Sequence, residues 1–325
     1  MDYHHPDSRW EIFGVKDFES YRQALVVKGL FHQNVLKDVS ESFMLCEYMM
    51  AHAYYHYPLF DEALSKLLRI VEMAVKLRCK ELQISLDSTK VNRRTGQPFK
   101  KNFSELINDL DNKEPAKKIK NALDRFRILR NSIMHPESHT YNGAMGRNAI
   151  MFGIVILNMI FLPDQLFLGM ENEINRIRAI QSDFDKDLYV MIKGEQRILV
   201  ENIEIVGAVR LDSGWQYLLV AKPVLDLPNP KEFTYPVSII TDVTDLQFNG
   251  RQLSMRIAET EELIQIEETN HPANIAKYKE FIQLKDLVNK ADLLIYQQVE
   301  ESEIGKRKSE FWYNSLWRVN DNMFL

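Results

Sequence analysis

Hydrophobic and polar residues alternate with helical spacing through roughly the first 180 positions of the chain. The clearest segment runs from Leu59 to Leu82, where the apolar residues fall on one wide stripe. That stripe consists of Leu64, Leu67, Leu68, Val71, Val75 and Leu82. Basic residues lie off the stripe, at Lys66, Arg69, Lys76 and Lys80. With a similar segment from Val39 to Tyr55, the pattern predicts a bundle of helices joined mostly by short connections.

A later amphipathic segment is predicted to begin near Pro115 and to end at about His135. Its buried face is expected to carry Leu123, Phe126, Leu129 and Ile133. Because a proline disfavours helical geometry in the residue before it, Pro136 places His135 at or just past the last turn.

Two other segments complete the predicted bundle. Residues 85–102 are polar and are expected to form a loop. Residues 149–162 are the most apolar run of the chain, broken by Asn158 and ended by Pro163. Because this run is too short to span a bilayer, we expect a buried helix. The first residues show no signal-peptide pattern, so we expect no membrane segment and a cytoplasmic location.

The pattern changes near residue 186, where short runs rich in β-branched and aromatic residues begin. Turn sequences such as Asp212-Ser213-Gly214 and Asn249-Gly250 separate these runs. The predicted strands are Leu188–Ile192, Arg197–Val209, Trp215–Ala221, Tyr235–Thr241 and Leu253–Ile257. From Glu259 onward the pattern of apolar residues again predicts helix.

The expected fold class is therefore α+β with several domains. We predict an N-terminal extension over residues 1–40 and a helical bundle over 41–182. A small antiparallel β-sheet or barrel over 186–258 and a C-terminal helical segment over 259–325 would follow.

Composition and cysteine spacing narrow the classes of protein. Hydrophobic residues make up 45% and charged residues 27% of the 325 positions, as in an ordinary globular protein. Cys46 and Cys79 show neither zinc nor redox spacing, so both are expected to be buried thiols. His52 and His56 lie four apart, but no glutamate follows His52 as the zinc-protease pattern requires. We therefore expect no metal site and no cofactor.

The distribution of charge matters more than its sum. The net charge of −5 argues against a nucleic-acid partner when taken alone. However, residues 1–180 hold 25 basic and 22 acidic residues, whereas residues 181–325 hold 16 and 24. The stretch 90–130 holds 12 basic residues and 5 acidic ones. This stretch is either a solvated helix face or a surface for a polyanion.

The basic stretch leads into Arg130-Asn131-Ser132-Ile133-Met134-His135, the constellation with the clearest chemistry. Cleaving RNA without a metal needs a base for the 2′-hydroxyl and a cation for the charge on the phosphate. A histidine titrates near neutral pH and can act as the base. An arginine stays charged and can hold two phosphate oxygens. Asn131 could orient the ring of His135 or the phosphate.

The motif and its setting resemble the HEPN superfamily, whose signature is Arg-x4–6-His with a polar residue often following the arginine. The resemblance covers roughly residues 40–180, with Glu72 on the long helix and a very apolar closing helix after the motif. It implies a metal-independent endoribonuclease, active as a homodimer in which both motifs line one cleft. Toxin or anti-phage defence would be the biology. Some family toxins carry a tyrosine two residues after the histidine, where this chain has Glu137.

Catalysis is assigned to Arg130, His135 and Asn131, and RNA binding to a set of basic residues. That set is Arg93, Arg94, Lys100, Lys101, Lys117, Lys118 and Arg127. The acidic C-terminal half is expected to bind an inhibitory or sensing partner. The alternative is a catalytically inactive HEPN protein that serves as a dimeric scaffold.

Overall fold

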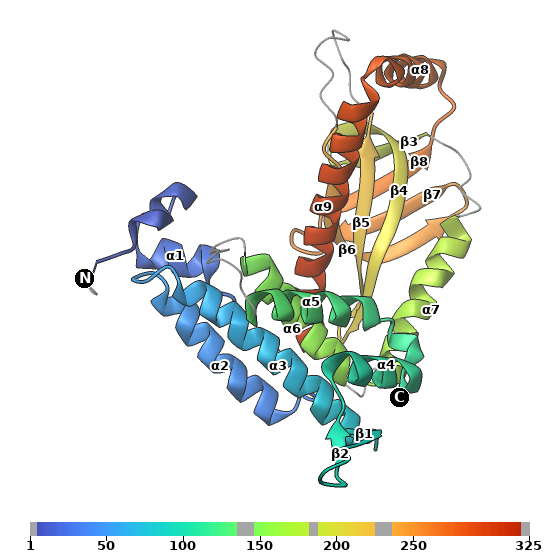
Figure 1. Ribbon diagram of the computed structural model, residues 1–325. Coiled ribbons are helices and arrows are strands. Elements are labelled where there is room, and N and C mark those ends of the chain that lie inside the picture. The colour runs from blue at the N-terminus through green and yellow to red at the C-terminus, as the bar shows by residue number, and fades with distance from the viewer. Residues whose placement is uncertain (1–4, 135–145, 182–187, 225–235, 320–325) are drawn as a thin grey trace. The chain divides into compact units, whose positions relative to one another are not determined.

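The computed structural model describes residues 5–134, 146–181, 188–224 and 236–319 (Figure 1). The chain forms two compact units. The helical unit comprises Met1–Leu168 with Leu316–Arg318, and the barrel unit comprises Gly169–Ser315 with Val319–Leu325. A helical N-terminal region followed by an antiparallel sheet with further helices confirms the expected fold class at this coarse level.

The helical unit is built around one long helix, α3, which contacts α2, α4, α5 and α6. Its elements are η1 (Ser8–Phe13), α1 (Phe18–Leu25), α2 (Lys37–His52), α3 (Leu59–Glu81), β1 (Asp87–Val91), β2 (Pro98–Lys100), α4 (Phe103–Lys113), η2 (Pro115–Lys117), α5 (Lys120–Met134), α6 (Gly146–Phe161) and η5 (Leu316–Arg318). The predicted apolar stripe of α3 is buried from Leu64 to Val75, and both cysteines are buried as expected. Burial raises the pKa of Cys46 to about 12 and that of Cys79 to about 11.

The segment before α2 belongs to the core of the helical unit. Trp10 is 1% exposed and packs edge-on against Tyr21 and Phe60. Its indole nitrogen donates a 2.8 Å hydrogen bond to the carbonyl of Ala53. A buried indole with its N–H paired fixes the N-terminal segment to the end of α2.

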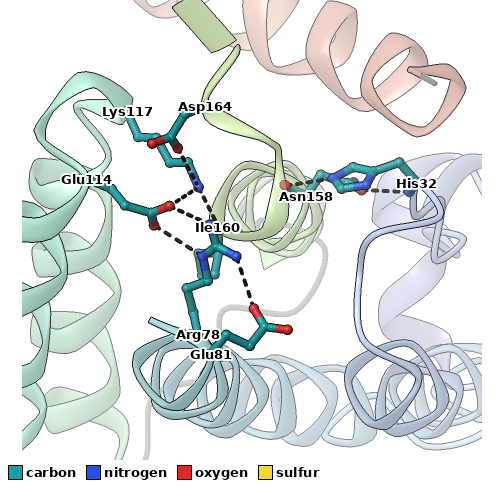
Figure 2. Close-up of polar contacts among 8 residues, drawn as sticks. All are labelled: His32, Arg78, Glu81, Glu114, Lys117, Asn158, Ile160 and Asp164. Atoms are coloured by element: carbon teal, nitrogen blue, oxygen red, sulfur yellow. Dashed lines mark hydrogen bonds and ion pairs between the residues drawn. The ribbon is translucent and has the colours of Figure 1, made fainter. Parts of the chain in front are cut away.

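A polar contact fixes the segment between α1 and α2 to α6. The backbone N–H of His32 donates to the side-chain oxygen of Asn158 at 3.0 Å, and the His32 ring contacts the Asn158 carbonyl at 2.8 Å (Figure 2). The Asn158 amide also donates to the carbonyl of Leu30 at 2.9 Å. The asparagine that interrupts the apolar run is therefore a fully buried anchor with its hydrogen bonds satisfied.

Residues 85–102 are not the irregular loop that their polarity predicted. β1 and β2 pair as an antiparallel hairpin, with Asp87 opposite Lys100 and Val91 opposite Pro98. Gly96 takes the left-handed conformation in the turn (φ 69°). The sequence gives no alternation of apolar residues here because most of the hairpin is exposed.

The helix that was predicted to begin near Pro115 begins later in the structure. Pro115–Lys117 form a single 3-10 turn, and Lys118 then adopts φ 51°, which interrupts helical geometry. The α-helix begins at Lys120 and is described to Met134.

The barrel unit contains a closed ring of six antiparallel strands in the order β3-β4-β5-β6-β7-β8. The strands are β3 (Tyr189–Lys193), β4 (Gln196–Leu211), β5 (Gly214–Pro223), β6 (Ile239–Asn249), β7 (Gln252–Ile257) and β8 (Leu263–Glu268). β3 pairs with both β4 and β8, which closes the ring. The interior is filled by side chains including Ile205, Leu219, Met255 and Ile266.

Two predictions for this unit are wrong. Helix does not resume at Glu259, because Leu263–Glu268 form β8, where the buried Ile264 and Ile266 alternate with more exposed residues. The fourth strand extends to Asn249 rather than to Thr241, because alternate polar residues of β6 face solvent. Residue Tyr235, its predicted start, lies outside the described residues.

Three helices complete the chain. α7 (Asp164–Gln181) begins in the helical unit and continues into the barrel unit, followed after the barrel by α8 (Pro272–Leu287) and α9 (Lys290–Ser315). α9 contacts strands β4, β5 and β6, and Phe311 packs near Gly207 of β4. No single described helix has the length and hydropathy to cross a membrane, although the sharply bent pair α6 and α7 has both when its helices are taken together.

Candidate functional site

Arg130 lies in the last turns of α5 and forms an ion pair with α3. Its Nη2 atom is 2.9 Å from Oε2 of Glu72, and the two side chains are 30% and 17% exposed. Two helices that are far apart in sequence therefore meet at the arginine of the motif. A partly exposed guanidinium held in this way keeps a fixed orientation while part of its surface stays accessible.

The second oxygen of Glu72 binds another cation. Oε1 accepts a 2.7 Å hydrogen bond from Nζ of Lys76, one turn further along α3. One carboxylate therefore bridges Lys76 and Arg130. Because two positive charges share one negative charge, this cluster keeps an excess of positive charge.

Asn131 contacts the arginine that it follows. Nη1 of Arg130 donates to the side-chain oxygen of Asn131 at 3.2 Å. The Nε atom of Arg130 is buried and has no hydrogen-bond acceptor among the described residues. Arg147, in the first turn of α6, has a buried Nε in the same state. His135, the proposed base, lies outside the described residues.

Sequence reasoning noted Glu72 within the apolar stripe but assigned it no role. The local sequence positions it, because Val71 and Val75 are buried and turn the neighbouring Glu72 to the edge of the buried face. A charged residue at the margin of such a stripe indicates that an oppositely charged side chain lies nearby. Only the structure shows that this side chain is Arg130, 58 positions later in the chain.

The predicted RNA contacts of the hairpin differ in their exposure. Arg93 and Arg94 lie in the exposed turn. Lys100 is 79% exposed and lies 2.6 Å from a carboxylate oxygen of Asp87. Lys101 is largely buried against Asp109, at 2.8 Å.

Lys117 does not fit its predicted role. Its ammonium group is fully buried and lies 3.0 Å from both Glu114 and the carbonyl of Ile160, and 3.5 Å from Asp164 (Figure 2). Burial and the nearby guanidinium of Arg78 lower the pKa of Lys117. A side chain without exposed surface cannot contact RNA, so Lys117 is a structural residue that ties η2 to the end of α6.

Arg78 and Glu114 complete this buried cluster. Arg78 Nε donates to Glu114 at 3.2 Å, a second guanidinium nitrogen donates to the other oxygen, and Nη1 lies 3.0 Å from Glu81 (Figure 2). Burial opposes ionisation of Glu114, but the hydrogen bonds and charges of Arg78 and Lys117 outweigh it and lower the pKa of Glu114. The cluster joins α3, η2 and α6 into one body.

The remaining predicted contacts lie on or next to α5. Lys118 is exposed between η2 and α5. Arg127 is one turn before Arg130, on the same side of the helix, and pairs with Asp124 at 2.9 Å. The structure thus brings Arg127, Arg130 and Lys76 toward one region, with Lys117 excluded.

The barrel unit has polar and hollow features of its own. Glu173 of α7 accepts a 2.7 Å hydrogen bond from the hydroxyl of Tyr217 and also pairs with Arg176 at 2.7 Å. Burial and this hydrogen bond raise the pKa of Tyr217. Two cavities of about 310 and 460 Å³ lie beside the strands, the first against α9 and the second against α8.

Within the described ranges, no three His, Cys, Asp or Glu side chains are grouped to hold a metal ion. Searches of protein-family models, curated proteins and solved structures find no match to this chain.

Proposed function

We propose that this protein is a metal-independent endoribonuclease of the HEPN type, with Arg130, Asn131 and His135 at its centre. The observation that carries the proposal is the Arg130–Glu72 ion pair. It fixes the motif arginine at the end of α5, a few residues before the motif histidine. A cation oriented before substrate arrives stabilises developing charge without further rearrangement.

In this reaction His135 takes the proton of the 2′-hydroxyl, whose oxygen then bonds to phosphorus. The bond from phosphorus to the 5′-oxygen breaks, and an acid returns a proton to that oxygen. Arg130 neutralises the charge on the phosphate oxygens. One motif supplies one histidine, so the acid comes from a second protomer in a homodimer whose two motifs share a cleft.

The RNA is bound by the accessible cations of the predicted set, without Lys117, which is buried, and without Lys101, which is largely buried against Asp109. Arg93, Arg94, Lys100 and Lys118 are exposed, and Arg127 lies beside Arg130. We place the activity in the cytoplasm, in toxin or anti-phage defence. In this proposal the barrel unit is the site of a sensing or inhibitory partner.

The decisive test is RNA cleavage in the presence of EDTA. Wild-type protein is expected to leave a 2′,3′-cyclic phosphate and a 5′-hydroxyl, and His135→Ala to lower the rate by about 10²–10⁴. Strict dependence on a divalent ion would refute the mechanism. An equal loss of activity and thermal stability in His135→Ala would identify a structural histidine.

The shared cleft has its own test. Arg130→Ala and His135→Ala protomers are each expected to cleave slowly alone, and mixing them should give activity that is not the average of the two. A fully active monomer at micromolar concentration would contradict the dimeric site.

The alternative function is an inactive dimeric scaffold. It is consistent with the same ion pair, because a purely structural arginine would also pair with Glu72. In that case Arg130→Ala lowers thermal stability and dimerisation, and no RNA cleavage is detected in the wild type.

A further inference from the structure

Helix α3 carries a row of basic residues on one face. Between Ala63 and Lys80 the helix has five basic residues and a single acidic one, Glu72. Arg69, Lys76 and Lys80 are seven and four residues apart, close to two turns and one turn at 3.6 residues per turn. They therefore lie above one another, and we call these three residues the α3 row.

The α3 row is open to solvent. Arg69 and Lys80 are exposed, and neither forms an ion pair or hydrogen bond with another described residue. Lys76 is 44% exposed and contacts Glu72. Long side chains with exposed charged ends can reach a ligand at little cost in desolvation.

The α3 row adjoins the motif through Glu72. The two oxygens of this carboxylate lie 2.7 Å from Lys76 and 2.9 Å from Arg130. The middle of the row is thus one carboxylate away from the guanidinium of the motif. At the other end, α3 leads past Lys80 to the hairpin that presents Arg93 and Arg94 (Figure 1).

We infer that a single RNA strand lies along the α3 row, which guides its phosphates past Arg130. This inference rests on the proposed function. The row is roughly 16 Å long at 1.5 Å per residue, so more than one phosphate of the same strand can contact it. Contacts of this kind position the backbone and carry no sequence preference.

The test is RNA binding by the full chain in the His135→Ala background, which is expected to slow cleavage during the measurement. The probe is a fluorescently labelled single-stranded RNA of mixed sequence, measured by anisotropy at several salt concentrations. Arg69→Glu with Lys80→Glu is expected to weaken binding at least tenfold. It should lower the salt slope by about 1.4, since each lost phosphate contact contributes about 0.7.

The matched control is Lys16→Glu with Lys37→Glu, which makes the same change in charge at exposed positions of the same unit. Its Kd should stay within twofold. If the row variant unfolds, Arg69→Gln with Lys80→Gln replaces it, with half the change in charge and the same predicted loss of contacts.

The outcomes separate the two proposals. If wild-type protein cleaves RNA with EDTA present but the row and control variants bind RNA equally, RNA binding along the α3 row is refuted and the proposed nuclease activity is supported. If the row variant loses RNA binding but the wild type never cleaves RNA, binding along the row is supported and the nuclease activity is refuted. If the His135→Ala protein does not bind RNA at all, the inference that RNA binds along the α3 row is wrong.

Discussion

Glu72 is the residue on which the orientation of Arg130 depends. Its charge-assisted bonds to Lys76 and Arg130 are lost in Glu72→Gln, which keeps the shape of the side chain. Because misplacement of a catalytic group by about 1 Å costs roughly 10²-fold in rate, we expect kcat to fall by about that factor with a small change in KM. Steady-state rates of RNA cleavage over a range of substrate concentrations measure both.

Glu62→Gln is the control for this variant, because Glu62 is an exposed carboxylate on the same helix. Its cleavage rate should match that of the wild type. A Glu72→Gln protein with unchanged kcat, or with a loss explained by lower thermal stability, would show that the ion pair is only structural.

Lys117 shows why a basic residue in the sequence is a poor guide to a binding surface. Lys117→Met leaves the carbonyl of Ile160 without its donor and Glu114 with Arg78 as its remaining partner. Removing one member of a buried ion pair costs about 3 kcal/mol or more, so we expect a loss of that size in urea unfolding. RNA affinity should be unchanged, and a weaker affinity without loss of stability would restore Lys117 as a contact.

Glu114 makes the stability of the helical unit depend on acid. The pKa of its carboxyl is lowered in the folded protein, so the stabilisation is present above the ordinary carboxyl value of 4.5. It is lost as the pH falls through the folded value. Thermal unfolding between pH 7 and pH 3 should therefore show a smaller acid-induced decrease in Tm for Glu114→Gln than for the wild type. Glu41→Gln, at an exposed carboxylate, should retain the full decrease.

At the scale of elements, segments with a clear pattern of apolar and polar residues were predicted correctly, and segments without such a pattern were not. The wide stripe of α3 and the apolar run of α6 are both confirmed. The hairpin of β1 and β2 could not be predicted, because exposed strands carry no buried alternation. Helix was predicted where β8 lies. The strand follows a glutamate-rich stretch, and its six residues are too few to distinguish the periodicity of a helix from that of a strand.

The α3–α6 contact is close because α6 has a glycine at the crossing. A Cβ atom on Gly153 would lie 2.5 Å from Cδ2 and 3.1 Å from Cγ of the fully buried Leu67. Overpacking costs about 1–3 kcal/mol, whereas alanine gains roughly 1 kcal/mol in helix propensity. We expect Gly153→Ala to destabilise the protein by about 1 kcal/mol in urea unfolding.

Gly305 of α9 provides the comparison, because a Cβ there meets no atom within 4 Å. Gly305→Ala should be neutral or stabilising. Equal effects of the two substitutions would show that Leu67 moves aside without cost.

At the scale of the whole molecule, the sequence identified the motif but not its surroundings. Arg130 and Asn131 are adjacent in the chain and their contact follows from that proximity. The links to Glu72 and Lys76 join α5 to α3, and no periodicity in the chain reports contacts between helices. Charge counts located the basic half of the chain, but burial decided that Lys117 is structural and that the α3 row is accessible.

The closure of the ring has a consequence for how such a chain can be rearranged. Tyr189 of the first strand lies opposite Glu268 of the last, so the polypeptide enters and leaves the ring at neighbouring points about 5 Å apart. A short glycine–serine linker can span that gap in place of residues 189–268. We expect the shortened chain to keep the circular dichroism and RNA affinity of the helical unit, whereas loss of both would show that the ring is needed for folding. Because its two ends adjoin, the ring can be replaced by another inserted domain in a gene fusion without separating the helices that precede and follow it.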